Sequence, residues 1–257
     1  MSAGRRATAP SPADGSAPAD PVGAGWSWGG DAVLSDLDGV LANSVAVVEA
    51  AWAWWAERVG VDAARLLTGI HGVRAEETVA RVVREQGLAV DVDVEVAAIE
   101  ARELELIAGT RAIRGAVAFA AAVPPERFAV VTSGSRPLAS ARLRTVGVPL
   151  PRVFVTADDV TAGKPDPQAY RSAARGLGVP ADRCLVLEDS PAGIAAGRAA
   201  GATVVGIATT HAASELAAAD VVVGDPGCLD VEVVADGASD GAAHRASDGA
   251  LRVTVPG

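Results

Sequence analysis

Short apolar runs alternate with longer amphipathic stretches along most of this chain. Four of the apolar runs are candidate strands, at residues 32–35, 128–132, 184–187 and 203–206. Continuous apolar strands separated by helical segments are typical of a parallel sheet that is covered by helices on both faces. We therefore predict an α/β fold, in which a ligand binds at the carboxyl ends of the strands.

The interval between the first two strands breaks this alternation. Residues 44–114 contain no convincing strand, and helical patterns occur at 45–59, 76–86 and roughly 94–108. This predicts a small all-helical cap domain over residues 45–114, inserted after the first strand, with hinges at Asn43–Ser44 and Arg114–Gly115. The catalytic core then consists of residues 31–44 and 115–234.

The two ends of the chain have the composition of loops. Residues 1–30 are rich in Ala, Pro, Ser and Gly, which predicts a disordered leader. Residues 235–257 are predicted to form a flexible tail. The run at 251–255 is a possible terminal strand that pairs back onto the sheet.

Charge and cysteine content narrow the function classes. The net charge of −10 disfavours binding to nucleic acids and to anionic membranes. The two cysteines form no C-x-x-C motif, and no apolar stretch suits a signal peptide or a membrane span. We therefore expect a cytoplasmic monomer. Only one of its 22 basic residues is a lysine, Lys164, which indicates a position where arginine would not serve.

The first predicted strand ends in two carboxylates, Asp36 and Asp38. Residues two apart on a strand point to the same side, so the two side chains repel each other unless a cation lies near them. A polar strand end followed by a turn at Asp38–Gly39 explains the pattern equally well. The pair alone does not decide between the two interpretations.

Polar residues also follow the other candidate strands. Ser133 and Gly134 offer a hydroxyl and a closely approachable amide, although a helix N-cap is an alternative. Lys164 lies in a loop stiffened by two prolines, and Glu188 and Asp189 end a further strand. Four acids and one lysine in a single crevice leave a surplus of negative charge. A hard divalent cation, Mg²⁺ by ligand type, would neutralise that surplus.

The order D-x-D-G, T-S-G, K-P and E-D resembles the four motifs of the haloacid dehalogenase superfamily. The resemblance spans roughly residues 31–223 and implies a Rossmann-like core with an inserted cap. Segments 71–78, 156–170 and 188–201 resemble the branch that contains glycerol-phosphate and 2-deoxyglucose-6-phosphate phosphatases. Val40 and Asn43 depart from the residues that many members carry, which weakens any assignment of a particular substrate.

This resemblance implies a role for each acidic residue. Asp36 would attack phosphorus, and Asp38 would protonate the leaving alkoxide and then activate water. Mg²⁺ would be held by Asp36, by the backbone carbonyl of Asp38 and by Asp189. Glu188 would be a neighbour of the metal site rather than a ligand.

The remaining implied roles concern the substrate. Ser133, Gly134 and Lys164 would bind the transferring phosphoryl group, whose charge spreads over three oxygens. His71 and Arg74 lie in a turn of the cap where relatives place substrate-selecting groups. A solvated turn is an equally weighted alternative for these two residues.

The predicted function is Mg²⁺-dependent hydrolysis of a small sugar or polyol phosphate, so the expected partner is a phosphorylated metabolite. Asp38 disfavours a dehalogenase, and the absence of a cap lysine disfavours a phosphonate hydrolase. A phosphosugar mutase of the same superfamily is the enzymatic alternative. A catalytically inactive binding or regulatory protein is the alternative from a different class.

Overall fold

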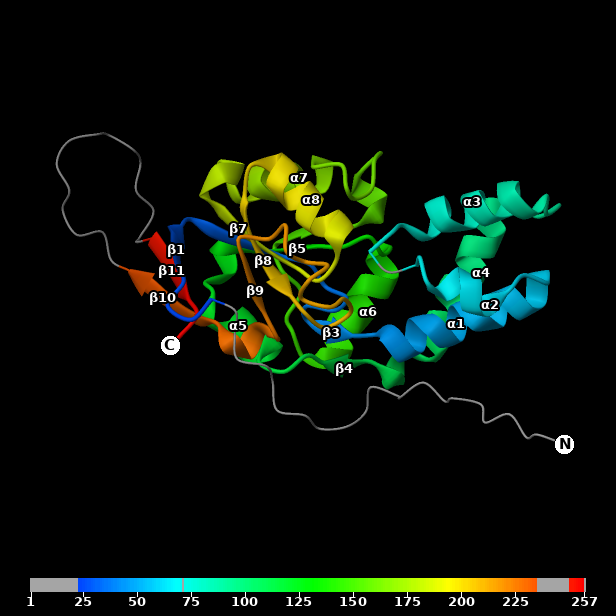
Figure 1. The fold of residues 1–257 in the computed structure, drawn as a ribbon, viewed down its shortest axis with the longest axis horizontal. Coiled ribbons are helices and arrows are strands. Elements are labelled where there is room, and N and C mark those ends of the chain that lie inside the picture. The colour runs from blue at the N-terminus through cyan, green and yellow to red at the C-terminus, as the bar shows by residue number, and fades with distance from the viewer. Residues whose placement is uncertain (1–22, 71, 235–249, 257) are drawn as a thin grey trace, which may run out of the picture.

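A six-stranded parallel sheet forms the centre of the computed structural model, which describes residues 23–70, 72–234 and 250–256. The strand order is β6-β5-β2-β7-β8-β9 (Figure 1). This confirms the predicted α/β class. The bounds are β2 (Ala32–Ser35), β5 (Phe128–Val131), β6 (Val153–Val155), β7 (Cys184–Glu188), β8 (Thr203–Ile207) and β9 (Val221–Val223).

Helices cover both faces of this sheet, as predicted (Figure 1). Successive residues of a strand point to opposite faces, so Val33 packs on one side of β2 and Leu34 on the other. The first side is covered by α5 (Ala116–Ala122) and α6 (Arg136–Val146), and the second by α7 (Gln168–Leu177) and α8 (Pro191–Ala200). Within the described residues, no helix is both long enough and apolar enough to cross a lipid bilayer.

The predicted helical cap follows the first strand of the main sheet. It consists of α1 (Val45–Val59), α2 (Ala63–Leu67), α3 (Ala75–Gln86) and α4 (Val92–Glu105). A two-stranded antiparallel ribbon, β3 (Ala42–Asn43) with β4 (Arg111–Ala112), joins it to the core. The cap has a hydrophobic core of its own, in which Trp52 and Trp55 pack edge to face with ring centroids 5.8 Å apart.

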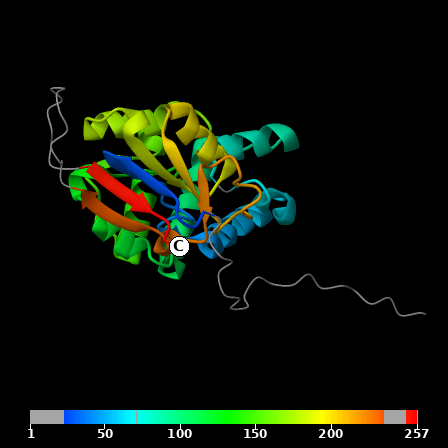
Figure 2. The same ribbon diagram turned by 60° about the vertical axis from the view of Figure 1, so that its left-hand side comes forward.

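The chain ends differ from the prediction. Ser27–Gly30 is not part of a leader but forms strand β1, which pairs with β11 (Ala250–Thr254). The predicted terminal strand therefore forms, but it joins β1 and β10 (Asp230–Val234) in a separate antiparallel sheet instead of the main one (Figure 2). Burial of Leu251 and Val253 in the main core explains why this small sheet is held in place. Residues 1–22 and 235–249 lie outside the described part.

Helix α8 lies unusually close to the sheet because glycines face the strands. Ser190 caps the helix by accepting a hydrogen bond from the Gly193 amide, and Pro191 occupies its first turn. A Cβ atom on Gly193 would lie 1.9 Å from the Glu188 carboxylate, and one on Gly197 would lie 3.0 Å from the Val204 side chain. The two glycines therefore set the distance between this helix and strands β7 and β8.

We expect Gly197→Val to lower the free energy of unfolding by about 1–3 kcal/mol more than a control substitution, because it overpacks this contact. Ala195→Val, on the exposed side of the same helix, is the control, and the difference is corrected for the about 1 kcal/mol by which glycine is poorer than alanine inside a helix. Urea denaturation of both variants measures the difference. Equal stabilities would show that the helix moves away from the sheet without cost.

Candidate active site

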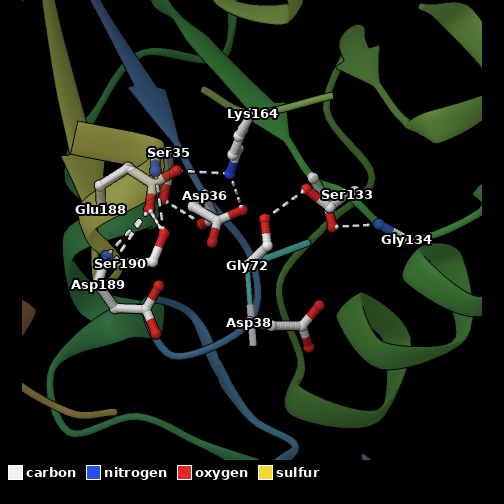
Figure 3. Close-up of polar contacts among 12 residues, drawn as sticks. Ser35, Asp36, Asp38, Gly72, Ser133, Gly134, Lys164, Glu188, Asp189 and Ser190 are labelled. Carbon is white, nitrogen blue, oxygen red and sulfur yellow. Dashed lines mark hydrogen bonds and ion pairs between the residues drawn. The ribbon is translucent and has the colours of Figure 1, made fainter. Parts of the chain in front are cut away.

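The predicted catalytic residues meet at the carboxyl ends of three neighbouring strands (Figure 3). Asp36 directly follows β2, Ser133 lies two residues beyond β5, and Glu188 is the last residue of β7. Lys164 reaches the same place from the loop between β6 and α7. Parallel strands end at one edge of the sheet, so segments distant in sequence are brought together here.

Lys164 lies between two carboxylates. Its Nζ is 2.9 Å from Asp36 Oδ1 and 2.5 Å from Glu188 Oε1, and all three side chains are buried. Burial raises the pKa of Asp36 to about 7, although Lys164 opposes this shift. Burial by itself would lower the pKa of Lys164, but the two carboxylates raise it above its usual value. Lys164 is therefore a fixed positive charge.

Tyr170 and Ser190 hold Glu188 in this arrangement. The Tyr170 hydroxyl donates to Glu188 Oε1 at 2.6 Å, and the Ser190 hydroxyl donates to Oε2 at 3.1 Å. The Lys164 ammonium also lies 5.5 Å from the centre of the Tyr170 ring, within range of a cation–π interaction. No motif in the sequence pointed to Tyr170. Its only signal is that it is the single tyrosine of the chain, placed six residues after Lys164.

Three buried carboxylates form a candidate metal site. Asp36, Glu188 and Asp189 each place an oxygen within 4.8 Å of the other two. Burial, followed by repulsion from Asp36 and Glu188, raises the pKa of Asp189 well above its usual value. One ammonium group cannot balance three carboxylates, and an all-oxygen ligand set suits Mg²⁺. The residues of this site therefore fit the cation predicted from the sequence.

The Asp38 carboxylate lies outside that group of acids. Its Oδ1 accepts a hydrogen bond from the Ser44 hydroxyl at 2.6 Å, and its Oδ2 lies 2.7 Å from Arg142 Nη1. Arg142 also forms an ion pair with Glu103 of cap helix α4. The sequence analysis missed Arg142, although an arginine on the buried face of α6, between Leu138 and Val146, is a detectable signal.

Of the predicted phosphate-binding residues, Ser133 contacts the cap, whereas Gly134 contacts the core. The Ser133 hydroxyl donates to the Gly72 carbonyl at 3.2 Å, and the Gly134 amide donates to Thr132 Oγ1 at 3.1 Å. Gly72 also lies against Ser190, because a Cβ atom on it would be 2.8 Å from the Ser190 hydroxyl. The cap turn thus lies directly over the site in this structure (Figure 3).

The two predicted cap residues have different outcomes. His71 lies outside the described residues. Arg74 is the N-cap residue of α3, and its side chain does not line the cavity. Its Nε is 3.7 Å from Glu76 Oε2, and its side chain packs over Gly163. Arg74 is therefore not among the described residues that line the cavity. Its contact with the substrate stays a prediction, and in this structure its side chain lies against Glu76 and Gly163.

A cavity of about 90 Å³ lies between the core and the cap. Asp36, Asp38 and Ser133 line its core side, and cap residues close the opposite side. The described cap residues among its walls are Val48, Trp52, Ile70, Gly72, Val73, Ala75, Glu76, Glu100 and Glu103. A small molecule bound next to Asp36 would therefore be enclosed by both domains.

Comparison with known families agrees with this geometry. Residues 31–201 match the model of the family described as haloacid dehalogenase-like hydrolase. The match spans more than half of the chain and includes all four motifs. This protein belongs to that family of hydrolases.

Curated relatives narrow the class to phosphatases. The chain is 40% identical to hexitol phosphatase A of Escherichia coli over 68% of its own length and 81% of that protein. It is 36% identical to glycerol-1-phosphate phosphohydrolase 2 of Saccharomyces cerevisiae over 70% and 75% of the two chains. The crystal structure of CbbY from Rhodobacter sphaeroides in complex with phosphate matches with a TM-score of 0.68 and 28% identity, covering 77% and 95%. The predicted resemblance is confirmed.

A substitution at Gly72 tests whether the cap contributes to catalysis. Gly72 has φ = +75°, and Gly72→Ala adds a methyl group against Ser190. We expect it to lower kcat/KM for p-nitrophenyl phosphate by at least about tenfold, because the turn can no longer approach the site. Gly60→Ala is the control, since Gly60 has φ = +77° in the same domain but no neighbour within 4 Å of the added atom. Equal activity in both variants would contradict a role for the turn.

Lys164→Arg keeps the positive charge and tests whether the site requires the compact ammonium group of lysine. The guanidinium group is broader than an ammonium, and Asp36, Glu188 and Tyr170 leave it no room. We expect kcat to fall by at least about 100-fold, as for removal of one charge-stabilising donor, while the variant stays folded. Steady-state kinetics and thermal unfolding measure the two quantities. Near-normal turnover by the folded variant would refute this role.

Proposed function

We propose that this protein hydrolyses a small sugar or polyol phosphate monoester in the presence of Mg²⁺, through an aspartyl-phosphate on Asp36. The observation that carries the proposal is the buried group of Asp36, Glu188 and Asp189 around a single ammonium, Lys164. The names of its relatives, which include a hexitol phosphatase and a glycerol-1-phosphate phosphohydrolase, support a phosphorylated polyol as the substrate.

In the first step, Asp36 attacks phosphorus and the bond from phosphorus to the alcohol oxygen breaks. The ion pair with Lys164 holds one Asp36 oxygen and so orients the carboxylate for attack. Lys164 and the Ser133 hydroxyl offer donors to the phosphoryl oxygens. Bound Mg²⁺, held by Asp36, the Asp38 carbonyl and Asp189, would neutralise part of the charge on these oxygens.

Asp38 handles the proton in both steps. It donates a proton to the departing alkoxide, then takes one from the water that attacks the aspartyl-phosphate, which releases inorganic phosphate and restores Asp36. Ser44 and Arg142 each contact one oxygen of Asp38. These contacts fix the carboxylate beside the cavity. Ser44 immediately precedes α1, the first helix of the cap.

A phosphate-release screen over sugar, polyol and glycolate phosphates tests the proposal. We expect a sugar or polyol phosphate to be hydrolysed with Mg²⁺ present and activity to be lost with EDTA. Asp36→Asn removes the nucleophile, so we expect at least about a 1,000-fold loss of kcat. Asp182→Asn, an exposed aspartate remote from the motifs, is the control.

The same screen separates the alternatives. Release of inorganic phosphate without an added sugar bisphosphate distinguishes a phosphatase from a phosphosugar mutase. Phosphate release by Asp36→Asn at the wild-type rate would refute the mechanism. Binding of these phosphates without any turnover would instead indicate the inactive binding protein.

A further inference from the structure

The end of the cavity that faces the substrate alcohol can be located from Asp38. In the proposed function, Asp38 exchanges a proton with the leaving oxygen, so the alcohol part of the substrate extends from Asp38 away from Asp36. Arg142 bridges Asp38 to Glu103 at that end. Glu100 lies three residues before Glu103, on the same face of α4, and both line the cavity.

The charges at this end are predominantly negative. Arg142 is the only lysine or arginine among the described residues that line the cavity, and it is already paired with Asp38 and Glu103. Glu100 forms no ion pair with a described residue. Glu76 also lines the cavity, and its ion-pair partner among the described residues is Arg74, at 3.7 Å.

Burial makes these charges effective. Arg142 and Glu103 are 3% and 4% exposed, and Glu100 is half-buried. The same burial raises the pKa of Glu103 to about 7 and the pKa of Glu100 above its usual value, so Glu103 is fully charged only above pH 7. Solvent and salt screen such charges poorly, so a second negative charge brought beside them would be repelled. Carboxylate oxygens accept hydrogen bonds from hydroxyl groups without this penalty.

We propose that Glu100 and Glu103 make the site select against any second anionic group, so that its substrates are monophosphates of uncharged polyhydroxyl compounds. The proposal rests on the proposed function and narrows it. Sugar bisphosphates and phosphorylated acids are excluded, because each would place a phosphate or carboxylate against α4. A mutase has to hold a bisphosphate in this part of the cavity, so the same charges favour hydrolysis.

Two matched pairs of substrates test the selection. Glycerol 3-phosphate and 3-phosphoglycerate differ by one carboxylate, and fructose 6-phosphate and fructose 1,6-bisphosphate differ by one phosphate. We expect kcat/KM of the wild type to favour the uncharged alcohol in each pair by at least about tenfold, equivalent to about 1.4 kcal/mol. Phosphate release under Mg²⁺, at equal ionic strength, gives these ratios.

Variants of α4 identify the residue responsible. Glu100→Gln keeps the shape, replaces one acceptor oxygen by an amide donor and removes the charge, so we expect each ratio to narrow by at least about threefold. We expect Glu100→Lys, which reverses the charge, to narrow each kcat/KM ratio further. Glu105→Gln is the control, since Glu105 lies on the same helix, is largely exposed and pairs with Arg102. We expect its ratios to equal those of the wild type.

The outcomes separate this inference from the proposed function. Wild-type hydrolysis of both members of each pair at similar kcat/KM would overturn the selection and leave the phosphatase proposal intact. Unchanged ratios in both Glu100 variants would also overturn it. Absence of phosphate release from all four compounds would overturn the proposed function, and the selection with it.

Discussion

Burial of three carboxylates around one ammonium is the constraint on which the rest of this structure depends. Such a group costs free energy, because each ion loses its water and the acids repel one another. Neighbouring residues are arranged to accommodate it. Tyr170 and Ser190 donate hydrogen bonds to Glu188. Glycines stand where a side chain would collide with an acid: a Cβ atom on Gly39 would lie 1.9 Å from Asp189, and one on Gly193 equally close to Glu188.

The cap is connected to this group through Asp38, the residue proposed to transfer the proton. Ser44, at the root of the cap, contacts Asp38 directly, and Glu103 of α4 reaches it through Arg142. The contact of Ser133 with Gly72 adds a third link. The last two are polar contacts between domains with separate hydrophobic cores, so the cap can move without disrupting either core. Enclosure of the substrate and alignment of Asp38 therefore depend on the same contacts.

Sequence patterns predicted those helices and strands whose bounds are set by residues close to them in the chain. Helix α1 and strand β2 have the predicted bounds, because caps and apolar runs mark them. Strand β1 was missed because its composition resembles a loop, and only pairing with β11, more than 200 residues away, makes it a strand. The motifs predicted Asp36, Lys164 and Asp189. Tyr170, Arg142 and the acids of α4 were missed because tertiary contacts, not neighbours in sequence, place them in the site.

The acidic character of the chain has a consequence for how it recognises phosphate. With a net charge of −10, the protein repels anions at long range, so a phosphate group binds only where a local cation outweighs that repulsion. Lys164 pairs with Asp36, which lines the core side of the cavity, and Glu100 and Glu103 line its cap side. In the proposed orientation, a monophosphate has its phosphate near the ammonium and its hydroxyl groups near the acids. A molecule with two anionic ends has no such orientation, because either orientation places one of them against Glu100 and Glu103.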